Sequence, residues 1–140
     1  MKIKRIIYHW SGRGPVAPLA AALHLGLVEP VPSGTAARKI TRKLAGGIPF
    51  GQGAGRERGT LIFLGTGESG EEVYLLPRGK EGKLLLTLVR ETARLLGEDP
   101  ETYYFIDCEL RTGRPPRSQE LFRRVEELVL AVKGELLRGL

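Results

Sequence analysis

Residues 3–26 read IKRIIYHWSGRGPVAPLAAALHLG, and this stretch decides the fold. The apolar run within residues 3–8 predicts a β-strand. The SGRGP loop at residues 11–15 then leads into an alanine- and leucine-rich helix. We expect this helix to begin at Pro15, because proline has no N–H to lose at the first helical position. Strand, glycine loop and helix in this order open many phosphate-binding α/β domains, and they also open α/β domains that bind nothing at the loop.

The remaining elements follow from hydrophobic periodicity. Two apolar runs at residues 60–66 and 72–77, joined by a glycine-containing turn, predict a β-hairpin. Residues 83–96 and 118–138 repeat leucine and valine at helical spacing and predict two helices. Residues 103–106 are continuously apolar. That pattern is typical of a strand buried on both faces in the middle of a parallel sheet.

These elements predict the α/β fold class. We expect residues 1–140 to form a single three-layer domain, with about four strands in a mixed sheet and helices on both faces. The opening is Rossmann-like or P-loop-like, but its loop lacks the Lys-Ser/Thr ending of a Walker A motif. Gly65, Gly67 and Gly70 match G-x-G-x-x-G, yet a strand-like run follows them. Without a helix to receive a pyrophosphate, we assign these glycines to a turn.

The composition is that of a globular protein. Hydrophobic residues make up 41% and charged residues 27% of the chain. No apolar run reaches the roughly 20 residues that span a bilayer, and the N-terminal run is too short for a signal-peptide core. We therefore expect a soluble, cytoplasmic protein without a membrane partner. Fifteen arginines against seven lysines, with nine prolines, fit a heat-adapted or GC-rich bacterial source.

The positive charge is concentrated in the first part of the chain. Residues 1–60 hold ten Lys/Arg and two acidic residues, a net charge of +8. Residues 61–140 hold twelve Lys/Arg and fourteen acidic residues, a net charge of −2. This split favours attraction of an anionic ligand or a nucleic acid to the end that carries the first loop, and a solvated surface explains it equally well. Residues 35–44 read as a short basic helix. Residues 51–59 read as a glycine-rich loop that either closes over an anion or is a floppy connection.

Candidate ligand-binding residues lie after the first strand, because ligands in open α/β sheets bind beyond the carboxyl ends of the strands. Ser11 supplies a hydroxyl, Gly12 and Gly14 supply backbone amides near the helix N-terminus, and Arg13 supplies a forked donor. This set of groups predicts an anion site at the loop. Second contacts to the anion are expected from other arginines, namely Arg38, Arg42 or Arg56.

Two further candidates end the last predicted strand. Asp107 could orient Arg13 or His9, bind a metal or accept a proton, and it could equally cap the following turn. Cys108 would be a nucleophile only beside a base that lowers its pKa, so we expect a buried, inert thiol. As the one cysteine, it excludes an internal disulfide, and with two histidines it provides no zinc-type cluster, so we expect no metal site. The sequence identifies no cofactor.

Three short motifs carry a resemblance that covers most of the chain. They are residues 20–26 (AAALHLG), residues 65–74 (GTGESGEEVY) and residues 113–115 (GRP). In this order they resemble a domain-of-unknown-function family of short proteins from anaerobic and spore-forming Gram-positive bacteria. The resemblance implies a strand, a polar glycine loop and a helix, with a cysteine and a His-Ser-Ser cluster in the loop. Here Trp10 stands at the cysteine position and residues 15–17 at the cluster, with Gly12 retained. If the family's loop is catalytic, the resemblance implies that this chain has lost that chemistry.

Three functional hypotheses remain. The first is a small protein that binds a phosphate-bearing or other anionic ligand at the loop of residues 11–15. The second is a non-catalytic interaction or scaffold protein, acting as a homodimer through the edge of the hairpin or the final helix. A nucleic-acid binder ranks third, because the basic residues are not interleaved with aromatic residues and form no recognisable reading motif. The sequence does not decide whether the protein is an enzyme, since no Ser-His-Asp order or pair of acids at a known spacing is present.

Overall fold

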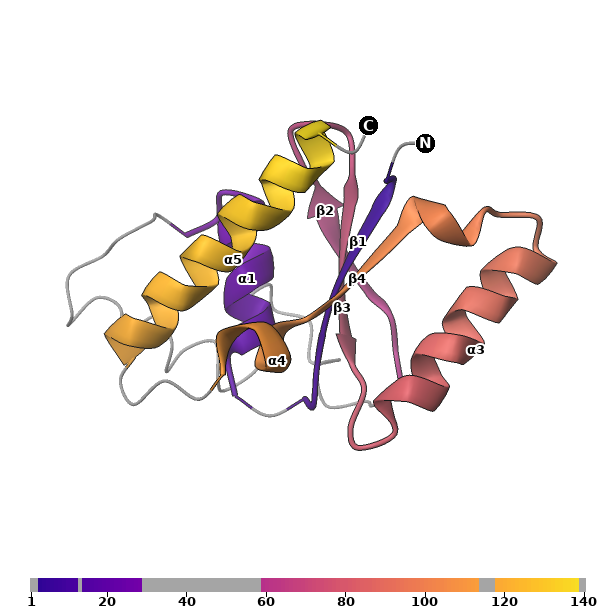
Figure 1. Ribbon diagram of the computed structural model, residues 1–140, viewed down its shortest axis with the longest axis horizontal. Helices are drawn as coiled ribbons and strands as arrows, with labels where there is room; N and C mark the ends of the chain where they lie inside the picture. The colour runs from indigo at the N-terminus through magenta and orange to yellow at the C-terminus, as the bar shows by residue number, and fades with distance from the viewer. Residues whose placement is uncertain (1–2, 13, 29–58, 114–117, 139–140) are drawn as a thin grey trace.

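The protein is built on a four-stranded mixed sheet. A computed structural model describes residues 3–12, 14–28, 59–113 and 118–138. The strands lie in the order β2-β3-β1-β4 (Figure 1). β1 (Arg5–Trp10) runs parallel to both of its neighbours, β3 (Glu72–Pro77) and β4 (Tyr103–Asp107). β2 (Ile62–Thr66) pairs antiparallel with β3, so the predicted hairpin and the mixed sheet are confirmed.

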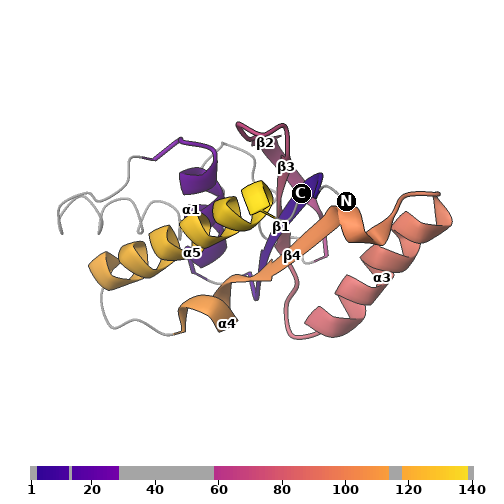
Figure 2. The same cartoon turned by 45° about the horizontal axis from the view of Figure 1, so that its top comes forward.

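Helices cover both faces of the sheet, as predicted. α1 (Val16–His24), α4 (Cys108–Thr112) and α5 (Ser118–Arg138) lie on one face, and α3 (Gly82–Leu95) lies on the other (Figures 1 and 2). A single turn of 3₁₀ helix, η2 (Pro100–Thr102), leads from α3 into β4. The three-layer α/β architecture is therefore the one that the sequence predicts. Among the helices of the described ranges, none combines the length and the apolar character needed to cross a membrane.

The main core lies between the sheet and the α1/α5 layer. Alternate residues of β1 point into this layer, and the residues between them point toward the α3 face. Both sets are buried, so β1 is covered on its two faces. The largest fully buried side chains of the α1/α5 layer are Ile6, Tyr8, Leu19, Val73, Leu75, Ile106, Val125 and Val132.

One prediction about the sheet is wrong. The continuously apolar run at residues 103–106 predicts a central strand, but β4 lies at the edge of the sheet and β1 is the central parallel strand. Tyr103, Tyr104 and Phe105 are only partly buried. The hydroxyl of Tyr103 reaches the Glu98 carboxylate at 2.5 Å, and that of Tyr104 donates to Glu135. Tyrosines place an apolar ring against the sheet while the hydroxyl reaches a polar group, so an aromatic run can occupy an edge.

α3 is loosely attached compared with the other long helix. Ala93 is its buried residue, whereas Leu84, Leu88 and Leu95 are largely exposed. Arg90 places its guanidinium over the ring of Phe105 at 5.0 Å from the centroid. The helix begins and ends one residue before the predicted bounds. Two other predictions, the basic helix at residues 35–44 and most of the loop at residues 51–59, lie outside the described residues.

Candidate functional site

The three parallel strands end on the same side of the sheet. We call this side, where their carboxyl ends lie, the carboxyl edge, as distinct from the edge strands β2 and β4. α1 follows β1 on one face and α3 follows β3 on the other, so the two connections leave this edge in opposite directions (Figure 1). They stay joined at their start, because the Arg78 N–H donates to the Trp10 carbonyl at 2.8 Å and the Gly79 N–H to the Ser11 carbonyl at 3.1 Å. In open α/β sheets, this divergence of two connections is where ligands bind.

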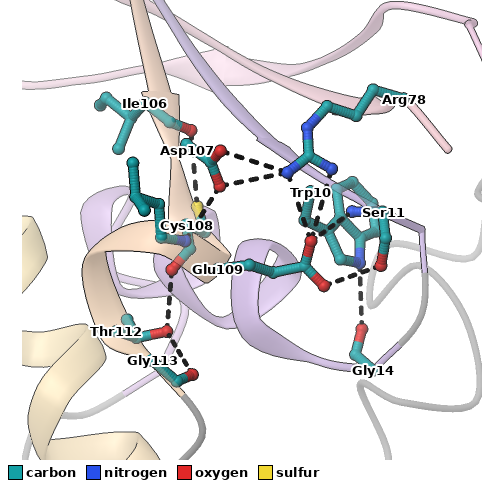
Figure 3. A network of polar contacts seen from close by, with 11 residues as sticks. Trp10, Ser11, Gly14, Arg78, Ile106, Asp107, Cys108, Glu109, Thr112 and Gly113 are labelled. Atoms are coloured by element: carbon teal, nitrogen blue, oxygen red, sulfur yellow. Dashed lines mark hydrogen bonds and ion pairs between the residues drawn. The ribbon is translucent and has the colours of Figure 1, made fainter. Parts of the chain in front are cut away.

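A cluster of four side chains occupies the edge, and we call Ser11, Arg78, Asp107 and Glu109 the carboxyl-edge cluster. The Glu109 carboxylate accepts the backbone N–H of Ser11 at 2.9 Å and the hydroxyl of Ser11 at 2.7 Å. Both terminal nitrogens of Arg78 lie 3.4 Å from the same carboxylate (Figure 3). Of the donors that the sequence assigns to an anion, the Ser11 hydroxyl thus holds an anionic side chain of the protein itself.

Asp107 lies on the other side of the Arg78 guanidinium. One terminal nitrogen of Arg78 is 3.2 Å from each Asp107 oxygen. The Asp107 side chain also accepts the Leu110 N–H at 3.0 Å and so caps α4, one of the roles that the sequence leaves open. Burial alone would raise the pKa of Asp107, but the Leu110 hydrogen bond and the Arg78 charge outweigh it, and the pKa lies below its usual value.

The first loop is shaped by two glycines with positive φ. Gly12 has φ +99°, and a side chain there would meet the Cβ of Pro77 at 3.4 Å. Gly14 has φ +78°, and its carbonyl accepts the indole N–H of Trp10 at 3.2 Å. Trp10 is therefore a buried anchor of the loop. Several candidate contacts of the predicted anion site, namely Arg13, Arg38, Arg42 and Arg56, lie outside the described residues.

His9 lies beside this cluster on the α3 face of the sheet. It pairs in register with Leu76 on β3 and Asp107 on β4. Its side chain is buried, and its Nδ1 atom has no hydrogen-bond partner among the residues that the structure describes. Burial lowers the pKa of His9 to about 4, so the ring is neutral at pH 7.

A second cluster of polar side chains, Tyr8, His24 and Glu71, is buried away from the carboxyl edge, between α1, β1 and the β2–β3 turn. His24 Nδ1 lies 2.7 Å from the Tyr8 hydroxyl, and His24 Nε2 lies 2.8 Å from the Glu71 carboxylate. A carboxylate only accepts, so Nε2 carries the proton and Nδ1 accepts from Tyr8. Burial lowers the pKa of His24, which keeps this neutral tautomer at pH 7. We call these residues the core triad, and they tie the helix to the sheet.

The G-x-G-x-x-G glycines serve the hairpin and the core triad. A Cβ on Gly67 would lie 2.5 Å from the Glu71 carboxylate, and Gly70 has φ +84°. A Cβ on Gly65, inside β2, would meet Leu25 at 3.3 Å. The assignment of these glycines to a turn is confirmed for Gly67 and Gly70, whereas Gly65 lies in β2.

The structure also places Cys108 in the core. The thiol is fully buried behind the edge, and burial raises its pKa well above the usual value. It is 3.8 Å from the Ile106 carbonyl. Within the described ranges, no three His, Cys, Asp or Glu side chains are grouped so as to hold a metal ion.

Sequence reasoning identifies Ser11 and Asp107 and misses the two residues that join them. Arg78 directly follows β3, and Glu109 lies two residues after β4. The available signal is that a charged residue follows the apolar run at residues 72–77. The hairpin interpretation does not reveal that this run also pairs in parallel with β1.

Comparison with known proteins places the chain in a family. Searches of curated proteins and of solved structures gave no match. The family model described as "Protein of unknown function (DUF3189)" matches residues 5–114. The match includes every strand of the sheet and all four residues of the carboxyl-edge cluster. The chain therefore belongs to the DUF3189 family of proteins of unknown function.

Proposed function

We propose that the carboxyl edge of the sheet binds a small anionic ligand through Ser11 and Arg78. The observation that supports this proposal is the position of the Glu109 carboxylate on the Ser11 N–H, the Ser11 hydroxyl and the Arg78 guanidinium. These donors suit an oxyanion, because the Glu109 carboxylate, itself an oxyanion, already accepts hydrogen bonds from them. A ligand carboxylate or phosphate would take the same place once Glu109 turns away.

Exposure indicates which member of the cluster would move. The Glu109 side chain is 39% exposed, whereas that of Arg78 is 13% exposed. Glu109 belongs to the five-residue α4 and can rotate into solvent without uncovering the core. Arg78 and Ser11 are held by the backbone bonds between their loops. Glu109 therefore acts as a competitor for the site, and Ser11 and Arg78 act as its fixed donors.

The proposal is for binding without nucleophilic catalysis by the loop. Trp10 stands where the family resemblance places a cysteine, and its indole is committed to the Gly14 carbonyl. The loop of this chain therefore differs from the loop that the family resemblance implies, which carries a cysteine and a His-Ser-Ser cluster. Cys108 is buried and has a raised pKa, so it offers no thiolate at the edge.

Two substitutions with opposite expected effects test the proposal. Phosphate and acetate binding are measured by calorimetry at constant ionic strength. Ser11→Ala removes the hydroxyl donor and should weaken binding about tenfold, as expected for a hydrogen bond to a charged group. Glu109→Gln replaces the competing carboxylate with a neutral amide, and we expect it to tighten binding.

Glu127→Gln on α5 is the matched control. It changes the net charge by the same amount as Glu109→Gln, and Glu127 pairs with Arg123 on the exposed surface of that helix. Affinity should stay at the wild-type value in this variant. Equal affinities for all four proteins, or no binding of either anion by any of them, would contradict the proposal.

A homodimeric scaffold is the second candidate function, and the outer strand of the hairpin favours it. β2 is an edge strand of the sheet, and Phe63 on it is 49% exposed. An exposed edge with an apolar side chain is suited to pairing with another strand. Light scattering at increasing protein concentration should give twice the monomer mass, and Phe63→Lys should restore the monomer. A monomeric wild type at high concentration would contradict this candidate.

A further inference from the structure

A groove lies directly beside the carboxyl-edge cluster. It has a volume of about 420 Å³ and opens between the β3–α3 connection and the first turns of α3. Residues lining it include Gly59, Arg78, Lys80, Leu84, Leu85 and Leu88. Its volume falls in the range of about 300–1,000 Å³ that is usual for small-molecule sites.

One wall of the groove is apolar and open to solvent. Leu84 is 60% exposed and Leu88 is 55% exposed. Leu95 continues the same side of α3 two turns later, because residues spaced by four and seven positions share a helix face. The leucines form a track that is bordered by Lys83, and Glu91, seven positions after Leu84, lies on the same face between Leu88 and Leu95. An exposed apolar track of this kind is usually part of an interaction site.

The other wall is cationic. Arg78 lines the groove and is also the residue that contacts Asp107 and Glu109. Lys80 is exposed, and it forms no ion pair with any residue of the described ranges. Glu81 is the acidic residue among those lining the groove. The positive side chains stand at one end of the leucine track, at the carboxyl edge of the sheet.

We propose that the ligand is a single-chain amphiphile, with a carboxylate or phosphate head at the carboxyl edge and a hydrocarbon body along Leu84 and Leu88. This inference rests on the proposed anion site and adds the class of the ligand. The arrangement fits such a molecule because Arg78 belongs both to the groove and to the cluster, so one ligand can use both. The volume of the groove suits a small molecule, whereas a protein partner usually buries about 800 Å² of surface on each side.

The test is the dependence of affinity on chain length. Binding of acetate, hexanoate and decanoate, and of the matching alkyl phosphates, is measured by calorimetry below their micelle concentrations. Each methylene that the groove buries should tighten binding by up to about fourfold, the equivalent of about 0.8 kcal/mol. Comparison of the two head groups shows whether a carboxylate or a phosphate is preferred.

Matched variants locate the hydrocarbon body. Leu88→Ser should remove most of the dependence on chain length, because its side chain lines the groove. Leu130→Ser is the control, since Leu130 is 63% exposed on α5 and does not line the groove. Lys80→Gln should weaken all members of the series by the same factor. Because Leu88 and Leu130 are exposed helical residues, both serine variants should lower the midpoint of thermal unfolding by a similar small amount, set by the lower helix propensity of serine.

The outcomes separate this inference from the proposed function. If acetate or phosphate binds and longer chains bind no tighter, the anion site stands and the amphiphile inference is overturned. A chain-length dependence that Leu88→Ser and Leu130→Ser change equally also overturns it, because the body then binds elsewhere. If no member of either series binds, both proposals fail. Adsorption to anionic vesicles without binding of the monomeric amphiphile likewise contradicts the inference.

Discussion

His24 is the residue through which α1 is tied to the sheet and to the β2–β3 turn. Its two ring nitrogens are both used, one by Tyr8 and one by Glu71, and all three side chains are buried. Buried polar groups lose their hydrogen bonds to water on folding, so each group of the triad depends on a partner within the triad. Removing the polar atom of one residue therefore leaves its partner atom without a hydrogen bond.

Tyr8→Phe should therefore lower the free energy of unfolding by about 1–3 kcal/mol, since it leaves the Nδ1 atom of His24 without a donor. Tyr104→Phe deletes the same hydroxyl from a partly exposed tyrosine that donates to Glu135. We expect this control to cost less than about 1 kcal/mol, because water can replace the lost contact. Urea unfolding of the two variants gives the comparison. Equal losses would show that the core triad contributes no more than a surface hydrogen bond.

Gly67 in the β2–β3 turn leaves the space that the Glu71 carboxylate of the core triad occupies. Gly67→Ala should displace the Glu71 carboxylate, which lies 2.5 Å from the position of the added Cβ. We expect a loss of about 1–3 kcal/mol from the disturbed contact with His24. Gly134→Ala is the control, because its Cβ would meet Arg138 only at 3.9 Å inside α5. It should stabilise the protein by about 0.5–1 kcal/mol, the usual gain of alanine over glycine in a helix. A neutral Gly67→Ala would contradict the role given to that glycine.

At the scale of elements, the sequence predicts what depends on local periodicity. β1, α1, the β2–β3 hairpin, α3, β4 and α5 all appear within one or two residues of the expected bounds in the described ranges. α4 is missed because five residues are too few to show a helical repeat, although Asp107 at its N-cap is a usual start signal. The sequence does not predict the order of the strands. This order depends on pairing between β1 and β3, whose partners Arg5 and Glu72 are 67 residues apart.

The candidate site likewise combines residues that local sequence pattern reveals with residues that only the strand pairing reveals. Ser11 and Asp107 can be found because each follows an apolar run that reads as a strand. Arg78 and Glu109 become visible only when the parallel pairing of β1 with β3 and β4 is known. The anion site expected at the first loop also omits the Glu109 carboxylate that accepts from Ser11, because the two residues are 98 positions apart in the sequence.

The two long helices should differ in stability. α5 buries Phe122, Val125 and Val132 in the main core, whereas the buried residue of α3 is Ala93. Few buried contacts permit local opening at low free energy. Amide hydrogen exchange should therefore be faster in the middle of α3 than in the middle of α5. Equal protection of the two helices would show that the exposed leucines of α3 are covered in solution.

For the whole molecule, the two buried histidines make stability depend on pH. Burial lowers the pKa of His9 to about 4 and also lowers that of His24, while both rise to about 6.5 in the unfolded chain. As the pH falls below about 6.5, the unfolded chain binds protons that the folded protein does not, so the free energy of unfolding decreases. Asp107 acts in the same direction at lower pH, because its folded pKa lies below the usual 3.8 and its contribution is lost on protonation.

We expect urea midpoints to fall steadily from pH 7 to pH 4.5 and to change little from pH 7 to pH 8. His9→Leu removes one of the two groups and should flatten this dependence, because its unfolded form no longer takes up that proton. The variant also removes a buried Nδ1 atom that has no partner within the described part of the chain. Any decrease in the free energy of unfolding at pH 7 should therefore come only from the different packing of leucine and the imidazole ring. A wild type whose midpoint is constant between pH 7 and pH 4.5 would contradict the burial of both rings. A variant as acid-sensitive as the wild type would assign the effect to His24 alone.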